Sequence, residues 1–332
     1  MPNPDLTRRR MIAIVATAAG SALLTGGRTA RADDAVRWHG SALGAQVSIE
    51  IHHPDRTEAR LLVDRCVHDV RRLEQQFSLY RPDSAISTLN RTGILIEPDA
   101  DMVALLKASL AFAELTGGAF DPTVQPLWQL HAGHFATGSP DPNGPSKDQL
   151  AETLAKVGHG GLLVRDDRVA LRRHGAAITL NGIAQGYATD RVVEMLRGSG
   201  LSTTLVNMGE IRAIGARPDG APWRVGLADP DRPGMLTETV ELIDRAIATT
   251  AGAGFRFDPQ GRFTHLFDPV TGRSPSRYRT VSVIAPTATE ADALSTAFSL
   301  MPFSAIQDIV FVRPNVQARL TDGGGTLIIC GA

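Results

Sequence analysis

The order of the hydrophobic repeats along the chain is the feature that most restricts its fold. Apolar residues recur every three or four positions over 57–77 and again over 102–115, which predicts two amphipathic helices early in the chain. Segments with the pattern of short β-strands are mostly found after position 176. Because helices come first and strands gather later, the pattern favours an α+β fold over a doubly wound parallel sheet.

The other expected elements are short. Two glycines stop the second helix, and 137–146 has the glycine and proline content of a loop. Segments 205–214 and 223–228 have the pattern of two strands paired around the turn 218–220. We also expect strands over 47–51, 177–180, 247–250, 264–267 and 280–285, and helices over 184–196 and 290–300.

The first 32 residues have the pattern of an export signal. Arg8 and Arg9 precede a mildly apolar run that is too short to span a bilayer, and 30–32 is a small-x-small cleavage site. Paired arginines are typical of the twin-arginine route, with an ordinary Sec signal as the alternative. We therefore expect a periplasmic protein without stable membrane insertion, whose mature part, 33–332, is one domain.

The charge balance excludes one broad class of function. The chain has 34 basic and 35 acidic residues, a formal net charge of −1, and only 5% aromatic residues. Nucleic-acid-binding proteins rely on a basic surface or on aromatic rings that stack with bases. We therefore expect no nucleic-acid partner.

Cysteine and histidine patterns give no strong metal or redox signature. Cys66 and Cys330 are too few and too far apart for a disulfide scaffold or a CxxC site, although an oxidising compartment would allow them to pair. His131 and His134 form an HxxH pair in an apparent loop. This spacing is compatible with a metal site, but it favours a solvated loop.

Two glycine-containing segments could let a ligand approach the backbone closely. Segment 116–123 reads Thr-Gly-Gly-Ala-Phe-Asp-Pro-Thr and combines two flexible residues with an apolar ring and an acceptor carboxylate. Segment 180–188 joins the end of an expected strand to a helix, whose free N–H groups suit an anion such as pyrophosphate. Alternatively, the first segment is a simple helix stop and the second a tight strand-to-helix connection.

Two later segments carry side chains suited to catalysis or metal binding. His265 precedes an Asp-Pro turn, and imidazole is well suited to move protons near neutral pH, although a lone histidine can also be structural. On the helix expected over 290–300, Asp292, Ser295 and Thr296 share one face. One carboxylate with hydroxyl and carbonyl oxygens suits Mg²⁺. The alternative is an acidic first turn that the helix dipole favours, with Thr296 bonded to its own helix.

Taken in order, these segments resemble the ApbE family of FAD:protein FMN transferases. The resemblance implies an α+β fold with mixed or antiparallel sheets flanked by helices. It also implies Mg²⁺-dependent transfer of FMN from FAD to a Ser or Thr hydroxyl of an acceptor flavoprotein, through a phosphoester bond and with release of AMP. The segments that carry it are 42–44, 78–84, 116–123, 181–188, 206–210, 248–252, 265–272 and 291–297.

The resemblance further implies roles for individual residues. His265 would be the catalytic histidine. Mg²⁺ would be held by Asp292, Thr296 and the backbone carbonyls of Gly182 and Ser295. The residues implied to bind FAD are Leu43, Tyr80, Ala119, Phe120, Asp121, Thr179, Gln185 and Leu266.

Some positions depart from the family pattern. The family commonly has Asp where Thr179 stands, Gly at Asn181 and Lys at Gln185, so contacts to adenine or to the phosphates should differ here. Glu210 and the segment 249–252 resemble a periplasmic subgroup associated with nitrous oxide respiration.

Two other functions are compatible with the same residues. An FAD pyrophosphatase would use water in place of the acceptor hydroxyl, and a periplasmic flavin-binding protein would hold FAD without turnover. Release of FMN and AMP in the absence of an acceptor would indicate the first, and tight FAD binding without turnover the second.

Overall fold

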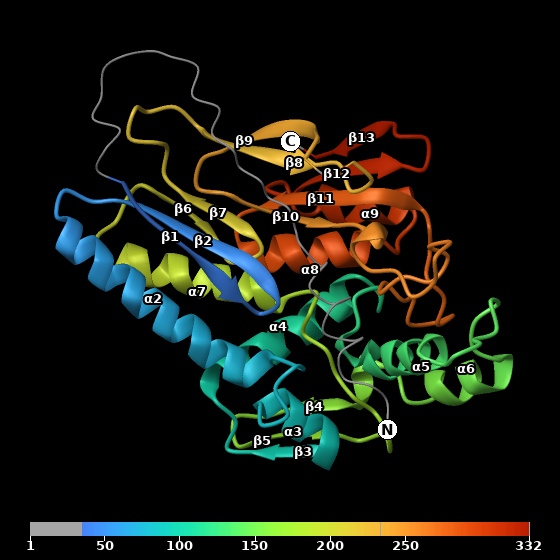
Figure 1. Ribbon diagram of the computed structural model, residues 1–332. Helices are drawn as coiled ribbons and strands as arrows, with labels where there is room; N and C mark the ends of the chain where they lie inside the picture. The colour runs from blue at the N-terminus through green and yellow to red at the C-terminus, as the bar shows by residue number, and fades with distance from the viewer. Residues whose placement is uncertain (1–34, 233, 332) are drawn as a thin grey trace.

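The computed structural model describes residues 35–232 and 234–331, so the expected export signal over 1–32 lies outside the described part. Antiparallel strands and packed helices form the α+β fold that the sequence predicts (Figure 1). Within the described ranges, no helix is both long and apolar enough to cross a bilayer.

An eight-stranded sheet forms the centre of the fold, and each of its neighbouring strand pairs is antiparallel. Its strands, in spatial order, are β1 (Ala35–Ala42), β2 (Ala45–His52), β6 (Thr204–Asn207), β7 (Ile211–Ile214), β10 (Ala246–Thr250), β11 (Tyr278–Ala285), β12 (Gln317–Asp322) and β13 (Leu327–Cys330). A smaller sheet contains β3 (Ile94–Ile96), β5 (Arg168–Leu171) and β4 (Leu162–Val164), and β8 (Trp223–Ala228) forms a hairpin with β9 (Leu236–Leu242).

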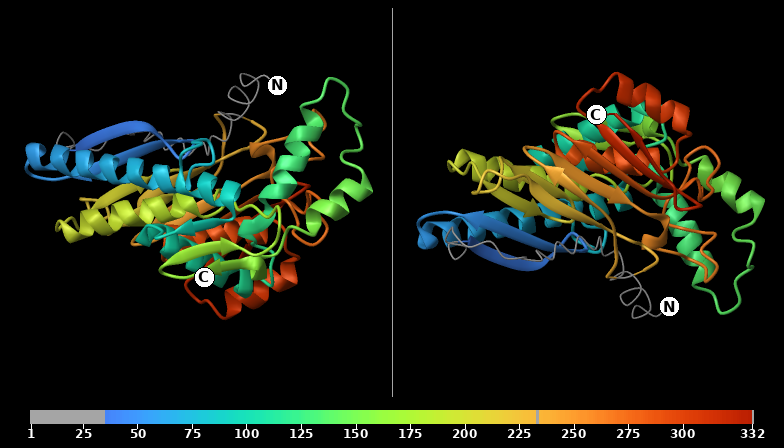
Figure 2. Two further views of the ribbon diagram at one scale, coloured as in Figure 1. Left: turned by 90° about the horizontal axis from the view of Figure 1, so that it is seen from below. Right: turned by 90° about the horizontal axis from the view of Figure 1, so that it is seen from above.

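Three helices cover one face of the large sheet. They are α2 (Arg56–Phe77), α7 (Ala184–Gly198) and α8 (Ala288–Phe298), and the view from below in Figure 2 shows α2 and α7 side by side on this face. The β8–β9 hairpin packs against the opposite face, where Trp223 and Leu242 join a separate apolar cluster. The remaining helices are α3 (Ala85–Thr92), α4 (Ala100–Leu115), α5 (Gln125–Phe135), α6 (Lys147–Leu154) and α9 (Phe303–Phe311).

The predicted periodicity of α2 is confirmed because its apolar stripe is buried. Leu62, Cys66, Val70 and Leu73 are all between 0% and 3% exposed, and the Asp55 carboxylate caps the helix by accepting from two backbone N–H groups. Full burial of side chains of this size contributes roughly 1.5–3 kcal/mol each. The stripe therefore fixes α2 on the sheet.

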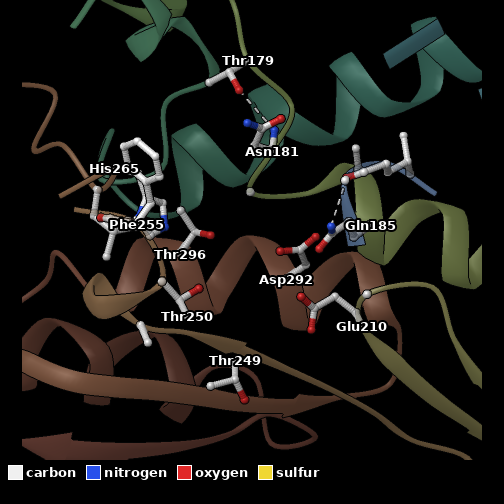
Figure 3. Close-up of a pocket in the computed structure, with 18 of the residues that line it drawn as sticks. Thr179, Asn181, Gln185, Glu210, Thr249, Thr250, Phe255, His265, Asp292 and Thr296 are labelled. Atoms are coloured by element: carbon white, nitrogen blue, oxygen red, sulfur yellow. Dashed lines mark hydrogen bonds between the residues drawn. The ribbon is translucent and has the colours of Figure 1, made fainter. Parts of the chain in front are cut away.

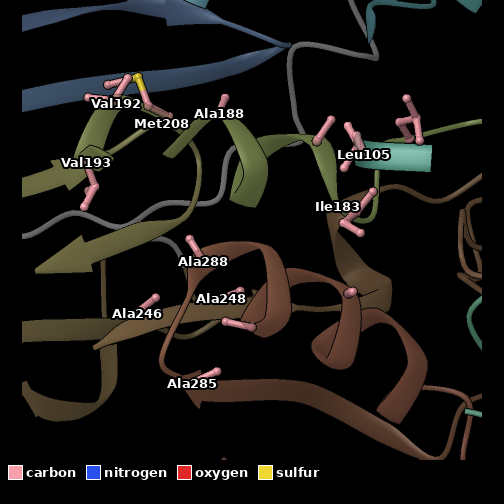
Figure 4. Packing of buried hydrophobic residues seen from close by; sticks show 14 of the residues in the cluster. Leu105, Ile183, Ala188, Val192, Val193, Met208, Ala246, Ala248, Ala285 and Ala288 are labelled. Carbon is pink, nitrogen blue, oxygen red and sulfur yellow. The ribbon is translucent and has the colours of Figure 1, made fainter. Parts of the chain in front are cut away.

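Small residues let α7 and α8 pack closely together. Ala188 of α7 and Ala288 of α8 are both fully buried in the main core, which Figure 4 shows in close-up. A β-carbon at Gly186 would lie 2.3 Å from the Ala288 carbonyl oxygen, so this position accepts only glycine at the observed spacing. The close approach brings Asp292 of α8 to the beginning of α7.

Two predicted strands are absent from the described residues. Segment 177–180 is not part of a strand. The Asn90 side chain bonds to the backbone N–H and carbonyl of Ile178 at 2.7 Å and 2.8 Å, in place of a neighbouring strand. Segment 264–267 contributes one isolated bridge, between Arg256 and Thr264. The Thr264 N–H donates to the Ser274 hydroxyl at 2.9 Å, which prevents a regular ladder.

The predicted pairing of 205–214 with 223–228 is also wrong. A turn at 208–210 divides 205–214 into β6 and β7, which pair with each other, while β8 pairs with β9.

His131 and His134 lie in α5 and not in a loop. The His131 Nδ1 atom bonds to the Leu127 carbonyl at 2.9 Å, and burial lowers its pKa, so this histidine is a packed core residue. Cys66 and Cys330 are free thiols in the structure.

Replacing Asp190 with alanine should strongly destabilise the fold. The Asp190 carboxylate, 9% exposed, accepts from Arg212 at 2.5 Å and from the backbone N–H groups of Ala288 and Thr289 at the start of α8. Removing one partner of a buried pair leaves an uncompensated charge and costs about 3–5 kcal/mol. Urea denaturation should show this loss in the free energy of unfolding. Asp166→Ala, which breaks an exposed pair with Lys107, should cost less than about 1 kcal/mol.

Candidate active site

A cavity of about 450 Å³ lies where the ends of several elements meet, between the large sheet, α8 and the segment that follows α4. This volume is in the usual range for small-molecule sites. Segments far apart in the sequence line it, among them the β1–β2 turn, the start of α7, the β6–β7 turn and the loop after β10. The predicted site residues that line it are Leu43, Tyr80, Ala119, Phe120, Asp121, Thr179, Gly182, Gln185, His265, Leu266, Asp292 and Thr296. Ser295 does not line it.

The charged side chains of the cavity lining are all acidic. They are Asp121, Glu210, Asp229 and Asp292, and within the described ranges no lysine or arginine joins them. Two of these carboxylates are compensated by the protein itself. Asp121 accepts from the backbone N–H and the ring of His159, and Asp229 forms ion pairs with two arginines. The other two carboxylates determine the electrostatics of the site.

Asp292 is buried, and its carboxylate points into the cavity (Figure 3). One carboxylate oxygen accepts a hydrogen bond from the Gly186 backbone N–H at 3.0 Å, in the first turn of α7. Burial, together with the charge of Asp190, raises the pKa of Asp292 to about 7. The Gly186 N–H, one of the groups at the start of α7 that the sequence suggested as an anion site, therefore already binds a carboxylate of the protein.

Glu210 lies next to Asp292 in the turn between β6 and β7 (Figure 3). Burial and the charge of Asp292 raise the pKa of Glu210 well above its ordinary value, while a backbone hydrogen bond from Thr249 opposes this shift. Glu210 belongs to one of the family segments, but the sequence indicated no role for it in the site. Only its position beside Asp292 in the fold indicates its importance.

The oxygens proposed to bind Mg²⁺ are only partly brought together. Thr296 lies one helical turn after Asp292, and a β-carbon at Gly182 would be 2.9 Å from the Thr296 hydroxyl oxygen, so Gly182 lies against Thr296, and all three residues line the cavity. The Ser295 side chain faces away, toward the Thr250 hydroxyl at 2.7 Å. The Ser295 carbonyl accepts the helical bond from Ser299 at 3.2 Å, which leaves it one lone pair.

His265 lines the cavity on the side of the Phe255 backbone. Its Nδ1 atom is 3.4 Å from the Phe255 carbonyl oxygen. A carbonyl can only accept, so this contact places the proton on Nδ1 and leaves the Nε2 lone pair free. Burial lowers the pKa of His265, which favours the neutral ring. The arrangement suits a base that accepts a proton at Nε2.

Aromatic side chains form the apolar wall of the cavity. Phe120 was predicted, whereas Trp128 and Phe255 were missed; their ring centroids are 6.4 Å apart. Tyr80 is half exposed, and the Asn181 side chain hydrogen-bonds to its hydroxyl. Planar rings with a polar edge suit the binding of a planar heterocycle.

Gln185 and Thr179 are turned toward the protein in the structure. Gln185 Nε2 donates to the Leu43 carbonyl at 3.3 Å and so holds the β1–β2 turn, where Leu43 has a φ of 49°. The Thr179 hydroxyl accepts from the Asn181 backbone N–H at 3.2 Å. These two residues therefore support the turns that border the cavity.

Comparison with known proteins gives the family. The model of the ApbE family matches residues 43–320, which is most of the chain. The chain belongs to the ApbE family. The same range contains all of the predicted site residues.

Relatives and solved structures agree with this assignment. The FAD:protein FMN transferase of Treponema pallidum (strain Nichols) is 30% identical over 283 residues, which is 75% of this chain and 76% of the relative. The crystal structure of the ApbE protein of Thermotoga maritima is 31% identical, with a TM-score of 0.79 over 89% of this chain and 97% of that one. The apo flavinyl transferase ApbE of Pseudomonas stutzeri is 26% identical, with a TM-score of 0.76 over 91% and 97%.

Proposed function

We propose that this ApbE-family protein is an FAD:protein FMN transferase. The observation that carries the proposal is one cavity that holds an uncompensated buried carboxylate, a histidine with a free Nε2 and an aromatic wall. The Treponema pallidum relative is named an FAD:protein FMN transferase, and the Pseudomonas stutzeri relative is named a flavinyl transferase. FAD is the substrate and an acceptor flavoprotein is the partner.

The charge of the cavity supports a divalent cation. A pyrophosphate carries negative charge, and the charged side chains that line the cavity are acidic throughout the described part of the chain. The negative charge of these side chains would oppose the binding of the FAD pyrophosphate unless a cation were also bound. Asp292, Thr296 and the Gly182 carbonyl are oxygen donors of the kind that Mg²⁺ prefers. We therefore propose that these residues hold Mg²⁺, which when bound neutralises charge on the pyrophosphate oxygens.

In the proposed transfer reaction, His265 and the aromatic side chains have different roles. The acceptor hydroxyl oxygen attacks the phosphorus on the FMN side and forms a new P–O bond. The bridging P–O bond breaks, and its electron pair leaves with AMP. His265 Nε2 accepts the hydroxyl proton, and the aromatic wall of Tyr80, Phe120 and Phe255 orients the flavin nucleotide.

The direct test is mass spectrometry of an acceptor protein incubated with FAD and Mg²⁺. Covalent FMN on a Ser or Thr of the acceptor, together with free AMP, supports transfer. A parallel reaction without acceptor measures hydrolysis. Fast release of FMN and AMP in that reaction, with no flavin on the acceptor, would instead identify an FAD pyrophosphatase. FAD binding with no turnover in either reaction would identify a flavin-binding protein.

We also propose that the protein is exported to the periplasm by the twin-arginine route and loses residues 1–32. The support is the arginine pair, the mild apolar run and the small-x-small site. N-terminal sequencing of the exported protein should begin near Asp33. Changing Arg8 and Arg9 to lysine should retain the protein in the cytoplasm, whereas unchanged export would indicate the Sec route.

The acceptor we propose is a periplasmic flavoprotein, with the nitrous oxide respiration subgroup as the specific case. The support is the resemblance of Glu210 and 249–252 to that subgroup. Covalent flavin on a periplasmic acceptor of that respiration should disappear when the gene for this chain is deleted. Flavin that persists after deletion would exclude this partner.

A further inference from the structure

The Glu210 carboxylate is an acidic group of the cavity that the proposed function leaves without a task. Glu210 is 7% exposed and lines the cavity from the β6–β7 turn. The backbone of this turn is fixed, because the Glu210 carbonyl accepts from Met208 N–H at 3.1 Å and from the Thr189 hydroxyl of α7 at 3.0 Å. The turn therefore places Glu210 beside the cavity, where its side chain is buried.

Glu210 and Asp292 form a pair of like charges without a cationic partner. They lie next to each other in Figure 3, and throughout residues 35–232 and 234–331 neither takes part in an ion pair. The other two acids of the lining, Asp121 and Asp229, have partners. Burial of an uncompensated ion costs several kcal/mol. A charge supplied from outside the chain would remove this cost.

We propose that Glu210 is the second carboxylate of the divalent-cation site, opposite Asp292, and that the cation joins the β6–β7 turn to α8. This inference rests on the proposed function, because it concerns the same cation. Mg²⁺ sites commonly use one or two carboxylates and leave other positions to waters and substrate phosphates. Two carboxylates would balance the charge of one Mg²⁺ before FAD binds.

A structural role for Glu210 predicts a different result. The carboxylate accepts a backbone N–H from Thr249, and in a structural role this bond would stabilise β10 whether or not a metal is present. Neutralising Glu210 would then lower the stability of the metal-free protein. If Glu210 instead serves the cation, neutralisation relieves repulsion in the metal-free protein and weakens only the metal-bound state.

The test compares the wild type with Glu210→Gln, which keeps the shape and removes the charge. Calorimetric titration with MgCl₂, and with MnCl₂, in the absence of FAD should show an affinity about 10–100-fold lower in the variant. The metal-free Tm should equal or exceed that of the wild type, and the rise in Tm on adding Mg²⁺ should be smaller. Glu241→Gln, on the exposed side of β9, is the matched control and should behave as the wild type.

Glu210→Asp, which keeps the charge on a shorter side chain, should bind Mg²⁺ with intermediate affinity, and it preserves the test if the glutamine variant does not fold. Unchanged Mg²⁺ affinity in the variants would overturn the inference while leaving the proposed function intact. The same conclusion follows if the metal-free Tm of Glu210→Gln falls and its Mg²⁺-induced shift is unchanged. A wild-type protein that binds neither Mg²⁺ nor Mn²⁺ would overturn both this inference and the cation of the proposed function.

Discussion

Replacing Asp292 with alanine should abolish Mg²⁺-dependent FMN transfer and leave a folded protein. Asp292 is buried, points into the cavity and has no cationic partner among the described residues. A metal ion that polarises a phosphoryl group supplies several kcal/mol of stabilisation to the transition state, so its loss should lower the rate about 10²-fold or more. The measurement is covalent flavin on an acceptor peptide, over a range of Mg²⁺ concentrations.

A purely structural role for Asp292 predicts a much smaller effect. A carboxylate that only complements the helix dipole contributes about 0.3–1 kcal/mol to stability, and Asp292 already lies beyond the first residues of α8, which begins at Ala288. The matched control is Asp308→Ala on the exposed face of α9, which should change neither transfer nor Mg²⁺ dependence. Near-normal transfer by Asp292→Ala, with slightly lowered stability, would contradict the metal assignment.

The elements that sequence predicts well are those whose residues bury their own periodic stripe. Helix α2 was predicted over 57–77 and spans Arg56–Phe77, because Leu62, Val70 and Leu73 repeat along one face. The start of α8 was less exact. Its first residues are held by Asp190, which is almost a hundred positions earlier in the chain, and local pattern carries no information about such a partner.

The two predicted strands that the structure lacks, 177–180 and 264–267, were predicted wrongly for the same reason. An extended backbone becomes a strand only if another strand lies beside it, and this depends on residues far away in the sequence. Beside 177–180 lies the side chain of Asn90, and beside Thr264 lies Ser274. Both segments were predicted as strands from their local sequence, which does not distinguish a paired strand from a segment bonded to side chains.

In the candidate site, too, some residues could be predicted from local sequence, whereas others depend on contacts between distant segments. Ordered family segments were sufficient to predict most of the residues that the fold brings to one cavity, because most of these segments border it. They did not predict Trp128 or Phe255, which belong to a small aromatic cluster formed by α5 and the loop after β10. They also gave no role to Glu210, because its charge is significant only beside Asp292.

Replacing His265 with alanine should remove most FMN transfer while FAD still binds. The Nδ1 contact with the Phe255 carbonyl leaves Nε2 as the proton acceptor, and burial lowers the pKa of the ring, so the neutral form dominates at neutral pH. Loss of a general base typically lowers the rate by about 10²–10⁴-fold. Binding should change less, because Tyr80 and Phe120 line the cavity from other segments of the chain.

The measurement pairs FAD affinity with the yield of covalent flavin on an acceptor peptide, for the wild type and for His265→Ala. His68→Ala, on the exposed face of α2, is the matched control and should leave both quantities unchanged. If affinity and yield fall together in His265→Ala, the ring binds the substrate or supports the loop at Phe255, and proton transfer must be assigned elsewhere. If neither falls, the base is another group of the cavity. A loss of yield alone is the result that a proton-accepting Nε2 requires, because this atom acts on the acceptor hydroxyl and not on FAD.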